Sequence, residues 1–376
     1  MKVEFYRHAL GDEERESVQT CLRGLFLTTG EYVDRFEKQL AGYLHLPWAV
    51  GLTSCTAALH LSLLALDIGP GDEVITTPMT FIATVTAIMH TGATPVFVDV
   101  EAATGLLDPE RIEKALTPAT KAILPVHLYG NMCDMRRLRE IADRYGLRLV
   151  EDSAHCIEGE RDGVRPGGLS EAVCFSFYAT KNITSGEGGA AATRRAEIAE
   201  RIRLLRQHGM SREAADRYHG EYRHWDMLAC GWKYNMDNIH ASLLLPQMRK
   251  IDRLWEKRRE LYQRYAAALA GIPGVRLPGI PDGCKSAHHL LTILVSADLR
   301  DQVLSSLYRQ GIGVAVNYRA IHLLSYLREA LGYKEGDFPH AETIGRSTIS
   351  LPFWIGMGAA EVETVADSLR QAMHEK

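Results

Sequence analysis

The segment FSFYATKNITSGEGG, residues 175–189, places Lys181 between an apolar run and a group of glycines. A lysine on a protein surface is solvated and charged, with a pKa of about 10.4. A lysine that follows a buried strand in a glycine-lined turn is shielded from water, which lowers its pKa. Its neutral amine can then attack a carbonyl group and form a Schiff base. The glycines would let the backbone approach a bound ligand closely.

Polar and titratable side chains also follow two other apolar runs. Asp152 and His155 lie in EDSAHC after LRLV, and His127 and Asn131 follow AILPV. A carboxylate at the end of a buried strand is unfavourable unless a cation pairs with it. Asp152 is therefore either a helix cap or salt-bridge partner, or a carboxylate that keeps a ligand nitrogen protonated. For His127 the pattern favours a hydrogen-bonded structural role.

Hydroxyl groups and an aromatic ring follow two further runs. Thr53, Ser54 and Thr56 stand after AVGL, where a helix begins, and Phe81 follows EVITT. The free N–H groups of a helix N-terminus bind anions such as phosphate, although a serine or threonine there is often only an N-cap. Phe81 is either part of the core or able to stack on a planar ring.

These groups make a chemically coherent set. They comprise an anion site, a stacking ring, a carboxylate for a ring nitrogen and a lysine for an aldehyde. Each group alone has an ordinary structural explanation. Pyridoxal 5'-phosphate requires all four, so their combination predicts that cofactor.

The elements that must position these groups alternate between strands and helices. The apolar runs predicted as buried strands are 49–52, 73–77, 95–100, 122–126, 147–152 and 172–177. Helices are predicted to start at Asp108–Pro109 and to span 134–145, which ends at Gly146. This alternation predicts an α/β fold with a mostly parallel sheet. Such sheets bind ligands beyond the carboxyl ends of their strands, which is where the candidate residues lie.

The pattern changes near residue 250. A long amphipathic helix is predicted over 251–271, strands over 289–295 and 311–318, and a final helix over 360–373. We therefore expect a large α/β domain over residues 1–250 and a smaller α+β domain over 251–376.

Composition narrows the class of protein. The chain has 376 residues with a net charge of −4, which argues against a dedicated nucleic-acid-binding protein. No apolar run reaches the roughly 20 residues of a membrane span, and no signal peptide is evident. The 7 cysteines include no CxxC pair that would suggest a zinc site. These features predict a cytoplasmic protein without a metal site.

Over nearly its whole length the chain resembles the DegT/DnrJ/EryC1/StrS sugar aminotransferases, a family with the aspartate-aminotransferase-like fold (type I) of pyridoxal-phosphate enzymes. The resemblance rests on several motifs in order: LTTGEYVDRFEKQLAGYL, TSCTAALHLSLLALDIGPGDEVITTPMTFIAT, KAILPVHLYGN, VEDSAH, FSFYATKNITSGEGG, LLRQHGM, GWKYNMDNIHASLLLPQM and SLPFWIGM. The stretches KNIT, QHG, KYN and NYRAIH are most similar to the branch that aminates UDP-linked 4-keto sugars, such as the UDP-4-amino-4-deoxy-arabinose aminotransferases.

The resemblance implies catalytic and ring-binding roles for four residues. Lys181 would form the Schiff base with the cofactor and then move the proton between substrate and cofactor. Asp152 would pair with the pyridinium nitrogen, and His155 would lie near the phenolic oxygen. Phe81 would stack on the ring.

Other roles implied by the resemblance concern the phosphate and the substrate. Ser176, Thr56 and the backbone of Cys55 would hold the phosphate of the cofactor. Asn235 would reach the phosphate of a neighbouring subunit, so a homodimer with shared active sites is expected.

On the substrate side, Tyr318 and His322 would face a nucleotide sugar, and glutamate would donate the amino group. The product would be a 4-amino sugar nucleotide for cell-surface polysaccharide or lipopolysaccharide synthesis.

The chain departs from the family pattern at three places. Cys55 stands where many members have glycine, and Tyr178 replaces a common histidine. Met236 and Asp237 follow Asn235 where many members carry an arginine. The third departure removes a candidate contact for the carboxylate of the amino donor, so none is assigned.

Three alternative functions make different demands on the sequence. Sugar dehydratases of the family, which use the pyridoxamine form of the cofactor, carry histidine in place of Lys181. A non-catalytic ligand-sensing domain of this fold belongs to regulators with an added DNA-binding domain, for which this chain has no spare segment. A nicotinamide-dependent dehydrogenase needs GxGxxG, but Gly186 and Gly188 are followed by Ala191.

Overall fold

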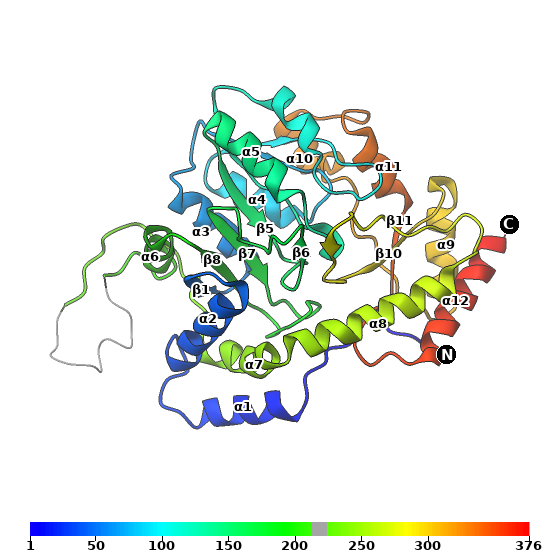
Figure 1. Cartoon of the computed structure of the whole chain (residues 1–376), viewed down its shortest axis with the longest axis horizontal. Coiled ribbons are helices and arrows are strands. Elements are labelled where there is room, and N and C mark those ends of the chain that lie inside the picture. The colour runs from blue at the N-terminus through cyan, green and yellow to red at the C-terminus, as the bar shows by residue number, and fades with distance from the viewer. Residues whose placement is uncertain (212–223, 376) are drawn as a thin grey trace.

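The computed structural model describes residues 1–211 and 224–375, and a seven-stranded sheet lies at its centre (Figure 1). The order of strands across the sheet is β1-β8-β7-β5-β4-β2-β3. Only β8 runs antiparallel to its neighbours, so the predicted, mostly parallel sheet is confirmed. The strands are β1 (Trp48–Leu52), β2 (Glu73–Thr76), β3 (Thr94–Phe97), β4 (Thr120–Ile123), β5 (Arg148–Asp152), β7 (Ala172–Ser176) and β8 (Gly189–Thr193).

All six predicted strands of the sheet are present, each within a few residues of its expected ends. The seventh, β8, was missed because its sequence GAAAT has low β propensity. Small residues are required there, since β8 is buried along its whole length between β1 and β7. The helix predicted over 134–145 is also confirmed: Asp134 accepts a hydrogen bond from Arg137 N, and Gly146 ends the helix at φ 67°.

Helices cover both faces of the sheet and also build the C-terminal part (Figure 1). The α-helices are α1 (Asp12–Leu22), α2 (Glu31–Leu44), α3 (Cys55–Ala65), α4 (Ile82–His90), α5 (Met135–Tyr145), α6 (Ala196–Leu205), α7 (Asn238–Arg249), α8 (Ile251–Leu269), α9 (Ala297–Arg309), α10 (Ser325–Leu331), α11 (Pro339–Ser347) and α12 (Ala359–His374). Short 3-10 helices are η1 (Pro109–Ala115), η2 (Leu128–Gly130) and η4 (Ile321–Leu323).

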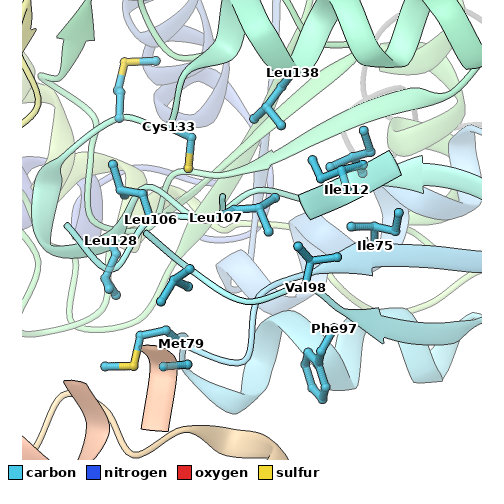
Figure 2. Close-up of a cluster of buried hydrophobic side chains, with 14 of the residues drawn as sticks. Ile75, Met79, Phe97, Val98, Leu106, Leu107, Ile112, Leu128, Cys133 and Leu138 are labelled. Carbon is cyan, nitrogen blue, oxygen red and sulfur yellow. The ribbon is translucent and has the colours of Figure 1, made fainter. Parts of the chain in front are cut away.

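Successive strand residues point to opposite faces and enter different cores. Val74 and Val150 pack on one face against α3 and α6, whereas Ile75 and Leu149 pack on the other face against α5. Figure 2 shows part of this second core, where Ile75, Phe97 and Leu138 come from β2, β3 and α5. Burial on both faces explains the uninterrupted apolar runs of the sequence.

The C-terminal part has its own core around a two-stranded antiparallel sheet of β10 (Leu291–Leu294) and β11 (Thr348–Leu351). The second strand predicted here, 311–318, is wrong, because that segment makes only isolated bridges such as Ala315 to Ser350. A further pair joins β6 (Glu160–Arg161) to β9 (Cys284–Lys285). We propose a domain boundary at residue 250, between α7 and α8.

The N-terminal segment lies against the C-terminal part rather than the central sheet. Val3 forms a parallel bridge with Ile312, and Trp354 Nε1 donates to the carbonyl oxygen of Glu4 over 3.1 Å. Val3 belongs to the same apolar core as α8, α9 and α12. None of the helices in the described ranges is both long and apolar enough for a membrane span.

Gly189 is a site where a substitution should disturb this fold. A Cβ added there would lie 2.2 Å from the carbonyl carbon of Ser54, because β8 passes directly beside the start of α3. We expect Gly189→Ala to lower the free energy of unfolding by about 1–3 kcal/mol, measured by urea denaturation. Gly42→Ala is the control, since nothing lies within 4 Å of a Cβ on this exposed α2 residue. Equal stability of the two variants would contradict the prediction.

Candidate active site

A cavity of about 590 Å³ lies beyond the carboxyl ends of the central strands. Its walls include segments that follow β1, β2, β5 and β7, as expected for a parallel sheet. Eight of the ten residues predicted for the site line it: Cys55, Thr56, Phe81, Asp152, His155, Ser176, Lys181 and Tyr318. Residues more than 250 positions apart in the chain thus meet in one cavity.

Lys181 lies in the loop between β7 and β8. Backbone hydrogen bonds between residues close in sequence hold the loop, among them Lys181 N to Tyr178 O at 2.9 Å and Ser185 N to Phe177 O at 3.0 Å. Gly186 and Gly188 adopt positive φ angles of 84° and 152°, which side chains disfavour. Burial lowers the pKa of the Lys181 amine to about 8, although the nearby Cys55 and Asp152 oppose the shift. A substantial fraction of the amine is therefore neutral at physiological pH.

Asp152 is buried at the end of β5 and has neutral hydrogen-bond donors. Thr84 Oγ1 donates to Oδ2 at 2.7 Å, and Ala154 N donates to Oδ1 at 3.1 Å. The Cys55 thiol, whose pKa burial raises, lies 3.9 Å from Oδ1. Within residues 1–211 and 224–375 the hydrogen-bond donors to Asp152 are all neutral. A cation stabilises a buried carboxylate further, so Asp152 fits a ligand with a protonated ring nitrogen.

The first turn of α3 faces the same cavity. Ser54, Cys55 and Thr56 all line the cavity wall, and Ser54 is also the N-cap, which accepts from Ala57 N at 3.1 Å. First-turn N–H groups lack intrahelical acceptors and can hold a phosphate. Ser176, at the end of β7, adds a hydroxyl group to this wall. The donor set therefore fits the phosphate of the predicted cofactor.

Aromatic rings form another side of the cavity. Phe81, at the N-cap of α4, is 55% exposed and is thus not part of the core. Its ring centroid lies 5.9 Å from that of Tyr318. The hydroxyl of Tyr318 lies 3.2 Å from His155 Nε2, and the two rings are nearly parallel. A planar ligand between Phe81 and the end of β5 would meet an aromatic face.

Two predicted residues lie outside the cavity wall. His322 is fully buried with Nε2 3.2 Å from Glu342 Oε1, so the structure gives it no access to a substrate in this cavity. Asn235 is also buried, and its amide donates to Thr29 Oγ1 at 2.8 Å. Its expected action in a neighbouring subunit stays a prediction.

The cavity also contains residues that the sequence did not single out. His289 lines the wall from just before β10, and Phe5 reaches it from the N-terminal segment. Neither residue follows a strand of the central sheet, so the strand-end rule could not find them. His127, expected to be structural, is fully buried, with Nε2 2.7 Å from Glu151 Oε2.

This fold and cavity are those of the pyridoxal-phosphate-dependent sugar aminotransferases. The model of the DegT/DnrJ/EryC1/StrS aminotransferase family matches residues 8–370, and the chain belongs to that family. Its cofactor is pyridoxal 5'-phosphate, as predicted.

Relatives and solved structures agree with this assignment. The spore coat polysaccharide biosynthesis protein SpsC of Bacillus subtilis (strain 168) is 39% identical over 368 residues, 96% of this chain and 94% of the relative. DesV of S. venezuelae, solved in complex with a ketimine intermediate, has a TM-score of 0.89 at 36% identity. The match covers 97% of this chain and 95% of the DesV chain. The putative sugar aminotransferase Spr1654 of Streptococcus pneumoniae, in its PLP form, has a TM-score of 0.92 at 29% identity, with 99% and 98% covered.

The lowered pKa of Lys181 predicts how the cofactor-free protein reacts with pyridoxal phosphate. Only the neutral amine attacks an aldehyde, so the reaction speeds up as pH rises. With a pKa of about 8, the rate should increase about tenfold between pH 7 and 9 and then level off. Rapid-mixing absorbance measurements in the visible range test this. A rate that continues to rise beyond pH 10 would show an ordinary lysine pKa and contradict the prediction.

Proposed function

We propose that the protein transfers the amino group of glutamate to C4 of a UDP-linked 4-keto sugar and so produces a 4-amino sugar nucleotide. The juxtaposition of Lys181 and Asp152 in one cavity carries the transamination part of this proposal. The stretches KNIT, QHG, KYN and NYRAIH support the UDP-4-keto-sugar branch. The product would serve polysaccharide or lipopolysaccharide synthesis, and the name of SpsC, a spore coat polysaccharide biosynthesis protein, is in keeping with the first of these.

Lys181 is the proposed catalytic residue. When bound, the cofactor supplies an aldehyde that carries the amino group and a ring that withdraws electrons from the reacting carbon. Lys181 would hold the cofactor through its aldehyde. Once glutamate has replaced it there, the freed neutral amine would take the proton from the α-carbon of glutamate, and in the second half-reaction it would give a proton to the sugar carbon. Its pKa of about 8 suits both directions of proton transfer.

The remaining residues hold and orient the cofactor in this proposal. Asp152 keeps the ring nitrogen protonated, and Phe81 packs against the ring. The first turn of α3, at Cys55 and Thr56, binds the phosphate together with Ser176. His155 would lie near the phenolic oxygen of the cofactor. Burial and the nearby Lys181 charge lower the pKa of His155 well below its usual value, so its neutral ring adds no positive charge there.

The protein is proposed to work as a cytoplasmic homodimer. All seven cysteines are free thiols, which suits a reducing compartment. In the dimer, Asn235 would contact the cofactor phosphate of the neighbouring subunit.

Mixing two inactive variants tests whether Asn235 acts across the dimer. Lys181→Ala and Asn235→Ala homodimers should each have low activity. If Asn235 acts in the other subunit, a mixed dimer contains one intact site, because the wild-type Lys181 of one chain meets the wild-type Asn235 of the other. We expect unfolding and refolding of an equal mixture to restore about a quarter of wild-type activity, since half of the dimers are mixed. No recovery would show that both residues act within one chain.

A visible absorption spectrum tests the proposed reaction. The cofactor band should fade when glutamate is added and return when a UDP-linked 4-keto sugar follows. dTDP- and GDP-linked keto sugars and 3-keto isomers serve as comparisons. A band that fades with glutamate but returns only with one of these would keep the aminotransferase assignment and replace the proposed substrate.

A further inference from the structure

A set of buried polar groups, connected by hydrogen bonds, begins at the residue that follows Lys181. Asn182, the next residue, donates through Nδ2 to Glu158 Oε2 at 2.8 Å and to the carbonyl oxygen of Ala287 at 2.9 Å. Its Oδ1 lies 3.1 Å from Nδ1 of His289. Glu158, Asn182 and His289 are all less than a tenth exposed. The mechanism above uses none of them.

These contacts determine the orientation of the Asn182 amide. Glu158 Oε2 and Ala287 O are both acceptors here, so the NH₂ group of Asn182 must face them. This holds for either protonation state of Glu158, since Oε2 can accept while Oε1 carries a proton. The amide oxygen therefore faces His289, and Nδ1 of His289 must carry the hydrogen that it donates.

The other ring nitrogen of His289 then has a lone pair. Burial and the charges of His155, Lys181 and Arg258 lower the pKa of His289 well below its usual value, so the ring is neutral. Nε2 has no hydrogen-bond partner within residues 1–211 and 224–375, and it is not among the fully enclosed unpaired atoms there. Since His289 lines the cavity, this nitrogen is an acceptor open to a ligand.

The neighbouring histidine has the opposite arrangement. His155 Nδ1 accepts from the backbone N–H of Tyr129 at 3.4 Å, so neutral His155 carries its hydrogen on Nε2. This N–H donates to the Tyr318 hydroxyl, which can pass its own hydrogen to a ligand. The rings of His155 and His289 lie 4.3 Å apart. The wall thus presents a hydroxyl donor, Tyr318, and an imidazole acceptor, His289, on either side of His155.

We propose that His289 is a sugar-recognition residue whose Nε2 accepts a hydrogen bond from a sugar hydroxyl, and that Asn182 and Glu158 are positioning residues that fix its tautomer. The inference rests on the proposed function, because the sugar supplies the hydroxyl. Of the two substrates, glutamate offers carboxylates, which cannot donate a hydrogen bond, and an amino group that is consumed by its transfer to the cofactor. A neutral hydroxyl matches a neutral acceptor, and a site built for such a hydroxyl rejects analogues that lack it.

The tautomer can be tested in the cofactor-free protein without any activity measurement. Selective ¹⁵N labelling of histidine and long-range ¹H–¹⁵N correlation distinguish Nδ1–H from Nε2–H rings, and His289→Gln assigns the signal. We expect His289 as the Nδ1–H tautomer and loss of this preference in Asn182→Ala. Glu158→Gln keeps an acceptor for Asn182 and should retain the tautomer. An Nε2–H ring in the wild type, or an unchanged ring in Asn182→Ala, would overturn the positioning role.

Substrate recognition is tested by comparing the two half-reactions. His289→Phe should slow the sugar half-reaction by about 10- to 100-fold more than the glutamate half-reaction, mainly through a higher KM. His289→Gln places an amide oxygen near the position of Nε2 and should recover most of this loss. His340→Gln, a half-buried histidine that does not line the cavity, is the control.

Two results separate this inference from the proposed function. Equal effects of His289→Phe on both half-reactions, or no rescue by His289→Gln, would overturn the recognition role while leaving the aminotransferase intact. If the wild type accepts no keto sugar nucleotide after reacting with glutamate, the proposed substrate fails first. With a substrate analogue that has no hydroxyl groups on the sugar ring, the wild type and His289→Phe should carry out the sugar half-reaction at similar rates. If the variant is still much slower than the wild type with this analogue, the proposed contact between His289 and a sugar hydroxyl is contradicted.

Discussion

Lys181→Ala is expected to abolish turnover, with kcat lowered by at least about 10⁴-fold. The variant loses both the covalent attachment of the cofactor and the group that moves the proton, and general acid–base catalysis alone contributes about 10²–10⁴-fold. The purified variant should still bind pyridoxal phosphate through its phosphate and ring contacts, but its absorption band should differ from that of the wild type. Single-turnover absorbance with glutamate measures the loss.

The stability of this variant should not fall with its activity. Alanine removes an amine whose pKa is lowered because burial disfavours its charge, so the unfolding temperature should stay equal or rise slightly. Lys121→Ala, at an exposed position on β4, is the control and should keep full activity. Retention of a tenth or more of wild-type turnover by Lys181→Ala would remove Lys181 from the catalytic role.

Asp152→Asn should have the second largest effect. The amide keeps the shape of the side chain but cannot hold a proton on the ring nitrogen, so the cofactor loses much of its electron-withdrawing power. Loss of a buried charge partner costs about 3–5 kcal/mol, which corresponds to roughly 10²- to 5 × 10³-fold in kcat. Both half-reactions should slow together, because the ring nitrogen serves both.

Thr84→Val provides the matched comparison for Asp152. It removes the hydrogen bond to Asp152 Oδ2 but leaves the carboxylate, so activity should fall by only about tenfold. A pH titration of the cofactor band gives a second readout, since the ring nitrogen of Asp152→Asn should lose its proton within the accessible pH range. An unaltered rate and titration in Asp152→Asn would assign Asp152 a purely structural role.

The strands of the central sheet were predicted well because they are buried on both faces. Each such strand is an uninterrupted apolar run, and the side chain after it must lie at the carboxyl edge of the sheet. Asp152 and Ser176 could be placed by this rule alone. The strand β8 could not, because its alanines and glycine are chosen for close packing beside α3 rather than for β propensity.

The substrate side of the cavity could not be predicted in the same way. His289 and Tyr318 come from the C-terminal part, where position in the cavity depends on how that part packs against the central sheet. His322, four residues after Tyr318, was expected beside it, but η4 turns it into the core toward Glu342. No local sequence pattern predicts the role of a buried group such as Glu158, because only the tertiary fold brings it next to its partner Asn182.

The path of the N-terminal segment also affects when the protein can first function. Phe5 lines the cavity, yet the hydrogen bond between Trp354 and Glu4 joins residues 350 positions apart. At about 5–20 residues per second, a ribosome needs roughly 20–70 seconds to make the intervening chain. Until Trp354 has been made, the segment with Glu4 and Phe5 has nothing to pack against, and this side of the cavity cannot form. A nascent chain therefore cannot have a complete active site before its synthesis is nearly finished.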